Sequence, residues 1–579
     1  MLKTLSALAA SGGTRSHVQR AVLLALLAAS HGVGAQTAPA TPDAGSLLQQ
    51  RQLPPRPAPG ADKAPSLQTP SQPLSLPAGT QVQVQRFDVL GNTLVPTDRL
   101  LAALAAYQGR RLSLAELQRA AAAVSEVYSQ AGLLARTFLP PQDVTDGVIR
   151  LQVEEARFGA VSVTGAAQRF DASRAAAYVA AQQASGEPVN LVRLERALIL
   201  LAELPGFDAK GSLAAGQAAG QTDLVIALSD TPLLTGEASL DNQGSRSTGA
   251  ARATLGLGLN GLLGLGDSLA GTLSASQGNQ YARFTAGLPL GVQGWRIGAS
   301  ASWLRYKLIG SDFAALLAEG SSQTQGIDLG YPLLRSGEAN AQLQLGAERK
   351  QFDNQANGAT ASHYSSRVVT LGLTGSLYDG LAGGGANSAS LLLSSGTIDL
   401  QGSPNAAADA AAAATQGSFN KLRYSASRLQ QISPQWSVYA LLTGQTSGSK
   451  NLDSSEKFYL GGPQGVRAYA VNEAGGSRGQ LVNLELRAQL ADGLRASAFY
   501  DWGQVRVNPR NGFTGAPRPN DITLQGVGAS LGWAGPAALD LRLTLARRIG
   551  NNPAANTLGR DQDGSLTRNR LWLQAGLPF

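Results

Sequence analysis

The chain has 579 residues with 15% charged side chains, 68 glycines and no cysteine, and its formal net charge is +8. It is too long for one ordinary soluble domain, and the absence of cysteine excludes disulfides and thiolate metal sites. The positive charge is mild for this length and does not indicate a nucleic-acid partner, and no internal run of 18 or more apolar residues predicts a membrane-spanning helix.

Residues 1–35 are predicted to be a secretory signal peptide. Three basic residues precede the apolar run Ala21–Ala29, and the small residues 33–35 form a cleavage site. The apolar run is too short to cross a bilayer as a helix, and a buried N-terminal helix is the alternative. Cleavage removes three basic and no acidic residues, so the formal net charge falls from +8 to +5.

Residues 36–80 are rich in Pro, Ala, Gln and Ser, a composition typical of an extended linker. Residues 43–53 depart from it, because they read DAGSLLQQRQL and are followed by two prolines. Asp43 at the start and proline after the end predict a short helix. A transient helix in a disordered tail is the equal alternative.

Two small mixed domains are predicted in tandem, at residues 81–155 and 156–230. Each follows the order strand, helix, helix, strand, strand, so the pair is an internal repeat. Each sheet can bury one layer of helices. The four expected helices are residues 96–107, 114–131, 172–183 and 191–204.

Helical spacing disappears after residue 230, and alternation of apolar and polar residues replaces it. About sixteen such segments occur in residues 231–579, at roughly 22 residues per strand and loop, which suits transmembrane strands. An even number of antiparallel strands closes without a free edge, as lipid requires. The predicted fold is therefore mainly β, with a transmembrane barrel of about 16 antiparallel strands after the two small domains.

The tryptophans fall in these strands or at their ends, where interfacial aromatic residues are expected: Trp295, Trp303, Trp436, Trp502, Trp533 and Trp572. The last strand places alternate residues from Leu571 to Phe579 on one face. A soluble β-solenoid or adhesin is the alternative, but it would repeat at a fixed short period that these segments lack.

The sequence offers no catalytic or metal-binding constellation. After signal cleavage His363 is the sole histidine, whereas a zinc site or a Ser-His-Asp triad needs imidazole placed among partners. A GxSxG match at 475–479 and a GxGxxG match at 256–261 lack the strand, turn and helix context of a catalytic or dinucleotide motif. We therefore expect no enzyme activity, no cofactor, no metal and no nucleotide.

A long connection at 448–479 contains the stretch FYLGGPQGVRAYA. Beside Arg467, the residues Val466 and Tyr469 suit a segment packed against protein, although a solvated outer loop is the alternative. An arginine folded into the barrel needs a carboxylate partner to offset its desolvation. Asp501 is the candidate, because the alternation of its strand points it inward.

A barrel of this size leaves a lumen wide enough for water. Most other inward-facing polar residues are therefore expected to be solvated, among them Asn483, Glu485, Arg487, Asp540 and Arg542.

Five stretches resemble one family: FLPPQDVTDGVIRLQVEE (138–155), LILLAELPGF (198–207), LDNQGSRSTG (240–249), LGGPQGVRAY (460–469) and FYDWG (499–503). With the predicted architecture, they are similar to the TpsB transporters of two-partner secretion, the hemolysin/hemagglutinin secretion-activation proteins of ShlB/FhaC/HecB type. The resemblance spans essentially the whole mature chain. It implies that the tandem domains are periplasmic POTRA domains and that the barrel lies in the outer membrane of a Gram-negative bacterium.

The resemblance implies that the loop tip reaches into the lumen, where Arg467 meets Asp501. The positions that match the family's loop and strand motifs, and that we expect to act in loop anchoring or transport, are Gly461, Gly462, Val466, Arg467, Tyr469, Phe499, Asp501 and Gly503. Ala468 stands where the family usually has glycine. If that position needs a positive φ, alanine costs about 1 kcal/mol or more.

The resemblance also implies export of one large secreted partner, a TpsA-type adhesin or cytolysin. We expect edges of the POTRA sheets within residues 81–230 to bind it unfolded, and the helix at 43–53 to plug the barrel at rest. Outer-membrane lipid is the other expected partner. The alternatives are a barrel-assembly or translocation factor, which usually carries more than two POTRA domains, and a passive porin.

Overall fold

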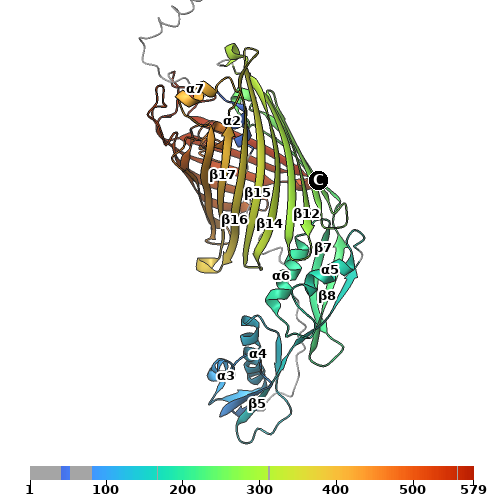
Figure 1. Ribbon diagram of the computed structural model, residues 1–579. Coiled ribbons are helices and arrows are strands. Elements are labelled where there is room, and N and C mark those ends of the chain that lie inside the picture. Colours follow the sequence, from blue (N-terminus) through green and yellow to red (C-terminus); the bar gives the residue numbers. More distant parts are fainter. Residues whose placement is uncertain (1–40, 52–80, 166, 311–312, 557) are drawn as a thin grey trace, which may run out of the picture.

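The computed structural model describes residues 41–51, 81–165, 167–310, 313–556 and 558–579. The predicted signal peptide and most of the predicted linker lie outside these residues. Figure 1 shows two small α/β units placed end to end below a tall barrel of long strands. The unit that comes first in the chain lies farthest from the barrel.

The first unit is built on a three-stranded sheet in the order β2-β5-β4, with β2 and β5 parallel. Its two helices bury apolar side chains such as Leu104, Val124 and Tyr128 in a common core with the sheet. A separate pairing of β1 with β3 adds a small sheet that the residue pattern did not predict. The bounds are β1 Gln81–Gln83, β2 Arg86–Leu90, α3 Thr97–Leu104, β3 Arg111–Ser113, α4 Leu114–Gln130, β4 Ala135–Phe138 and β5 Val148–Glu155.

Helix α4 starts where its sequence provides a capping box. The Ser113 hydroxyl accepts the backbone N–H of Glu116, and the Glu116 carboxylate accepts the backbone N–H of Ser113 at 2.8 Å. The buried side chains that follow recur every three or four positions, which gives the helix one apolar face: Leu117, Ala120, Ala121, Val124 and Tyr128.

Glu155 joins this helix to the end of the sheet. The Tyr128 hydroxyl donates to Glu155 Oε1 at 2.8 Å, and the backbone N–H groups of Thr93 and Leu94 each donate to the same oxygen at 2.7 Å. Burial raises the pKa of Glu155, but the hydrogen bonds from Thr93 and Leu94 outweigh it and leave the pKa below its usual value. The ionised carboxylate therefore fixes the turn after β2 onto β5.

The second unit repeats the order of the first, with the sheet β6-β8-β7. Its bounds are β6 Arg157–Gly165, α5 Ala172–Ala180, α6 Leu191–Ala202, β7 Phe207–Ala215 and β8 Gln221–Asp230. Asn190 caps α6, and Leu194, Leu198 and Leu201 lie fully buried against the sheet. The predicted internal repeat is thus present as two units with one strand order.

Helix α6 faces the near end of the barrel. Glu203, just after the helix, accepts from Arg335 Nε at 2.7 Å, and Arg196 Nη2 donates to the Pro332 carbonyl oxygen at 2.7 Å. The backbone N–H of Gly337 donates to Glu195 at 3.0 Å. These contacts fix the second unit against the end of β14 and the turn that follows it.

Sixteen strands of the described chain form a closed antiparallel barrel, as predicted. The closing pair joins Glu237–Asp241 of the first strand to Gln574–Pro578 of the last. The bounds are β9 Leu234–Asp241, β10 Arg252–Asn260, β11 Ser268–Ser276, β12 Asn279–Leu290, β13 Trp295–Lys307, β14 Glu319–Arg335, β15 Ala339–Ala356, β16 Ala359–Asp379, β17 Gly385–Asp399, β18 Gly417–Gln431, β19 Trp436–Ser447, β22 Arg478–Ala491, β23 Leu494–Arg506, β24 Asp521–Ala534, β25 Asp540–Arg548 and β26 Asn569–Pro578.

Apolar side chains project outward from the strands and polar ones inward. In β26, Leu571 and Leu573 are exposed on the outer face. Trp572 corrects the expectation of an interfacial ring, because it is 6% exposed and its indole lies inside the barrel. Within the described residues, no helix has both the length and the apolar character to span a membrane.

Candidate functional site inside the barrel

The connection between β19 and β22 folds back into the lumen. It contains the 3-10 helix η6 (Ser454–Glu456) and a short hairpin of β20 (Phe458–Tyr459) with β21 (Gly475–Gly476). Beyond the hairpin, Val466 and Tyr469 are both 0% exposed. This burial excludes a solvated outer loop.

Glycines allow the sharp turn at the loop tip. The backbone N–H of Val466 donates to the Leu460 carbonyl oxygen at 2.7 Å, which closes the turn. A Cβ added to Gly465 would overlap that same carbonyl oxygen, and Gly462 has a φ of +124°. A side chain at either position would push the chain out of this conformation.

Arg467 lies at the tip and binds Asp501 in a bidentate arrangement. Nε to Oδ2 measures 2.9 Å, Nη2 to Oδ1 measures 2.7 Å, and the backbone N–H of Arg467 donates to Oδ2 at 3.0 Å. The guanidinium carbon lies 3.4 Å from the ring centroid of Phe499. Arg467 is 6% exposed and Asp501 is 0% exposed. The structure thus brings together the arginine and the carboxylate that their positions suggested.

Two further residues complete the anchor and contradict the expectation that they are solvated. Glu485 Oε1 accepts from Arg467 Nη1 at 2.6 Å. Asn483 Nδ2 donates to Asp501 Oδ1 at 2.7 Å and to the Gly465 carbonyl oxygen at 3.2 Å. Asn483 and Asp501 are register partners in the hairpin of β22 and β23. Pairing these two strands in the sequence would therefore have identified Asn483 as a neighbour of Asp501.

The remaining motif residues pack around the anchor. Gly503 leaves space for the loop, because a Cβ there would lie 2.7 Å from a methyl group of Leu460 and 3.3 Å from one of Val466. The guanidinium carbon of Arg548 lies over the Tyr469 ring, 4.6 Å from the ring centroid. Gly461 approaches the Ala470 carbonyl oxygen so closely that a Cβ would overlap it.

The expectation of a strained backbone at Ala468 depends on a positive φ, which the structure does not show. Ala468 is absent from the residues with positive φ in the described chain, whereas Asn472 and Ala474 have φ values of 62° and 55°. The Ala468 side chain is 0% exposed, and its Cβ lies where a Cβ on Gly526 would meet it at 2.7 Å. Alanine therefore fits because the facing strand carries glycine.

The short helix α2 (Ala44–Gln49) lies inside the barrel near the end away from the two small units (Figure 1). Leu47 and Leu48 are buried in a cluster with inward side chains of the wall, including Tyr306 and Phe352. The backbone N–H of Ala44 donates to Asn354 at 2.9 Å. The helix expected within residues 43–53 is therefore present at 44–49, and it packs against the barrel wall.

Helix α2 also contacts the inward-folded loop. Ser454 Oγ donates to Asp43 at 2.6 Å, and Asn472 Nδ2 donates to the Ser46 carbonyl oxygen at 2.6 Å. A Cβ on Gly45 would clash with Ser454. The helix and the loop thus form one hydrogen-bonded assembly.

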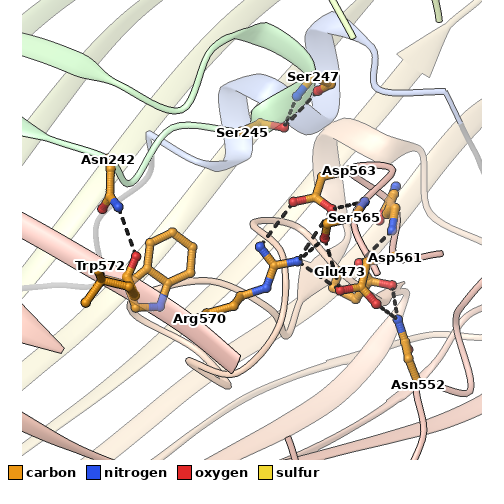
Figure 2. Close-up of polar contacts among 12 residues, drawn as sticks. Asn242, Ser245, Ser247, Glu473, Asn552, Asp561, Asp563, Ser565, Arg570 and Trp572 are labelled. Atoms are coloured by element: carbon orange, nitrogen blue, oxygen red, sulfur yellow. Dashed lines mark hydrogen bonds and ion pairs between the residues drawn. The ribbon is translucent and has the colours of Figure 1, made fainter. Parts of the chain in front are cut away.

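Trp572 connects the loop tip to the place where the barrel closes. Its indole Nε1 donates to the Arg467 carbonyl oxygen at 2.8 Å. Asn242, which follows β9, extends the closing pair, since its side chain donates to the Leu571 carbonyl oxygen at 2.9 Å and accepts from Leu573 N–H at 2.8 Å. Figure 2 shows Asn242 beside Trp572.

A second polar network ties the loop to the chain before β26. Arg570 pairs with Asp561 at 2.9 Å and with Asp563 at 3.1 Å. Asn552 donates both to Asp561 at 2.9 Å and to Glu473 of the loop at 2.6 Å (Figure 2). The loop is therefore held at Arg467 of its tip and again at Glu473, six positions farther along the chain. No sequence motif points to a role in the lumen for Trp572 or for this network.

Replacing Trp572 with phenylalanine is expected to destabilise the closed loop by about 1–3 kcal/mol, because the Arg467 carbonyl oxygen loses its buried donor. In planar bilayers we expect openings of the purified channel to become several-fold more frequent. Trp436→Phe is the matched control, since Trp436 is 45% exposed at the start of β19. Equal opening frequencies in the two variants would contradict the role of the indole.

A sixteen-stranded barrel with tandem α/β units before it and an arginine-anchored loop in its lumen defines an outer-membrane protein transporter. The chain belongs to the haemolysin secretion/activation family ShlB/FhaC/HecB, whose model matches residues 220–535, and residues 82–156 match the ShlB-type POTRA domain. It is a TpsB transporter of two-partner secretion, in the outer membrane with its POTRA domains in the periplasm, and the family exports TpsA-type partner proteins. The family is one of transporters rather than of enzymes.

Similar proteins match between about two thirds and nearly all of the chain. The heme/hemopexin transporter protein HuxB of Haemophilus influenzae (strain 86-028NP) is 28% identical over 537 residues, covering 88% of this chain and 92% of that protein. The outer membrane transporter CdiB of Dickeya dadantii (strain 3937) is 26% identical over 411 residues, covering 69% and 71%. The solved structure of CdiB from Escherichia coli has the same fold, with a TM-score of 0.66 at 19% identity and coverage of 98% and 99%.

Proposed function

We propose that this transporter takes up one large, unfolded adhesin or cytolysin through its POTRA domains and passes it through the barrel after helix α2 has left. The observation that carries the proposal is what occupies the lumen. Helix α2 and the loop fill it, and besides their buried apolar contacts they are held by hydrogen bonds and ion pairs, which water or a polar polypeptide can replace. A path for an extended chain then opens without unfolding the wall.

The POTRA edges are suited to bind an extended segment. Strand β7 pairs with β8 on one side, and among the described strands nothing pairs with its other side. Strand β2 is likewise an edge, paired with β5 alone in its sheet. An added passenger strand would continue either sheet through main-chain hydrogen bonds, which suits a partner of varied, β-forming sequence.

We assign the loop the role of the part that orders the path. The residues that carry it are Gly461, Gly462, Val466, Arg467, Tyr469, Phe499, Asp501 and Gly503, with Asn483 and Glu485 added from the geometry. They fix the tip against the inner face of β22, β23 and β24. No nucleotide takes part in this scheme, so transport rests on passenger binding and on passenger folding outside the cell.

Deleting the gene and comparing the proteins of the culture medium tests the function. We expect one large β-rich protein to disappear from the medium and to return on complementation with the intact chain. An unchanged medium would contradict the proposal. Loss of many outer-membrane barrels instead would favour an assembly factor, and a changed uptake of small solutes with normal secretion would favour a porin.

A further inference from the structure

The outer surface of β15 and β16 changes character at one row of residues. Phe352 and Lys350 of β15 are buried inside, so the alternate residues of this strand face outward. The outward residues nearer the POTRA end are apolar, and Leu345 of β15 and Leu371 of β16 are register partners there. The next rows toward the far end pair Ala347 with Val369 and then Arg349 with Arg367, beyond which the outward residues are polar. The arginine row therefore marks the extracellular boundary of the apolar band.

Arg349 and Arg367 are directly opposite each other and both are exposed. Cβ atoms of such partners lie roughly 4.5–5.5 Å apart, and like charges in this position destabilise a sheet. Within the described parts of the chain, neither guanidinium has an ion pair or hydrogen bond. Two unneutralised cations at one point of a strand pair call for a bound anion.

No nearby carboxylate of the described residues forms an ion pair with either arginine. Asp399 of β17, whose register partner Ser365 lies one row beyond Arg367, accepts the backbone N–H of Gln401 at 3.0 Å. Glu348 turns inward, where its carboxylate lies 3.5 Å from Lys350 Nζ. Asp353, two rows farther out on the same face, is paired with the His363 ring. The charge of the arginine pair is therefore available to a group from outside the chain.

A groove of about 580 Å³ runs across the same strands, and among the residues that line it are Gln325, Ile327, Arg349, Arg367, Val369 and Thr397. Ile327 and Val369 are 63% and 52% exposed on the membrane side of the arginines. The groove thus joins a cationic rim to an apolar wall, in the order in which a membrane lipid presents its headgroup and its acyl chains.

We propose that Arg349 and Arg367 together bind the phosphorylated headgroup of an outer-leaflet lipid, whose acyl chains lie over Ile327 and Val369. Phosphate oxygens match the donor geometry of guanidinium groups, and one phosphate carries enough charge to offset both arginines. The depth of the pair, at the boundary of the apolar band, is the depth of a lipid headgroup. A free phosphate would use the arginines and leave the apolar wall uncovered, so the lipid is the occupant we assign.

Native mass spectrometry of the detergent-solubilised full chain tests this proposal. The probes are diphosphorylated lipid A, the same lipid without its phosphates, and inorganic phosphate. We expect the diphosphorylated lipid to bind and the other two to bind at least ten-fold more weakly. Equal binding of the dephosphorylated lipid, or of inorganic phosphate, would overturn the assignment.

Variants identify the site. Arg349→Gln with Arg367→Gln is expected to weaken binding of diphosphorylated lipid A at least ten-fold. The control is Arg547→Gln, because Arg547 faces outward near the far end of β25, and its register partners Val527 and Asn569 carry no charge. Unchanged binding by the double variant, or an equal loss in the control, would refute the site.

A charge reversal keeps the test decisive if the double variant folds poorly. Arg367→Glu places a carboxylate opposite Arg349, which makes a favourable cross-strand pair in place of a repulsive one. We expect this variant to lose lipid binding and to have a higher Tm in detergent without lipid. A lower Tm with retained lipid binding would show that the arginine pair does not act as an anion site.

Discussion

Replacing Arg467 with alanine is expected to abolish secretion of the partner protein while the barrel still folds. The change removes the guanidinium that neutralises the buried Asp501 carboxylate, together with two of the hydrogen bonds to that carboxylate. Glu485 then has Arg487 as its remaining counter-charge. Breaking a buried pair in this way costs about 3–5 kcal/mol. The cost falls on the state in which the loop is docked, so the docked population drops by about two to four orders of magnitude. The strand pairing of β22, β23 and β24 does not depend on the loop tip.

The amount of partner protein in the culture medium measures this effect, and the heat-modifiable mobility of the chain shows whether the barrel has folded. Arg506→Ala is the matched control. Arg506 makes a similar bidentate contact with Asp521, at 2.8 and 3.0 Å, but about half of each side chain is exposed. Such exposed pairs contribute about 1 kcal/mol or less to stability. We expect full secretion from the control. Full secretion by Arg467→Ala would refute the anchor.

Arg467→Lys separates charge from shape. A lysine restores the positive charge but cannot donate to both Asp501 oxygens in one plane. We expect secretion to recover only in part. Complete recovery would show that the charge alone fixes the loop.

Deleting residues 43–53 is expected to raise the single-channel conductance in planar bilayers. Helix α2 occupies the lumen and buries Leu47 and Leu48 against the wall. Its removal opens space lined by side chains such as Asn354 and Arg423, which now bind Ala44 and Gln49 and would be wetted instead. A wider, wet lumen passes more ions.

A deletion of equal length from the predicted linker is the control for this experiment. It shortens the chain by the same amount and keeps the helix, so we expect the conductance of the intact protein. The plug role would be refuted if the helix deletion and the linker deletion gave the same conductance.

The fold could be predicted because each of its parts leaves a strong local signal. Leucines at helical spacing, at positions 100, 101 and 104, indicated α3, and period-two alternation indicated the long strands of the barrel. The small strand β3 was missed, since Arg111–Ser113 is too short for a pattern and depends on β1 for its pairing. Helix ends differed by a few residues because capping decides them.

The site could be predicted only where one residue type was out of place. Arg467 stands among apolar residues in a glycine-rich loop, which predicts that it needs a buried carboxylate partner. The alternation of β23 points Asp501 inward and so identifies it as that partner. Asn483 and Glu485 looked like ordinary lumen residues, because a sequence does not reveal which part of a wide lumen a loop fills. Trp572 was assigned to the membrane interface by residue type, although the alternation of its own strand already placed it inside.

The hydrogen bonds between helix α2 and the loop make the departures of these two segments energetically interdependent. Asp43 with Ser454 and Ser46 with Asn472 stabilise each segment only while the other is present. By thermodynamic reciprocity, a passenger that displaces the helix loosens the loop by the same free energy with which a loosened loop favours release of the helix. Unlocking therefore has the character of a cooperative switch, in which a single binding event at one segment prepares the other.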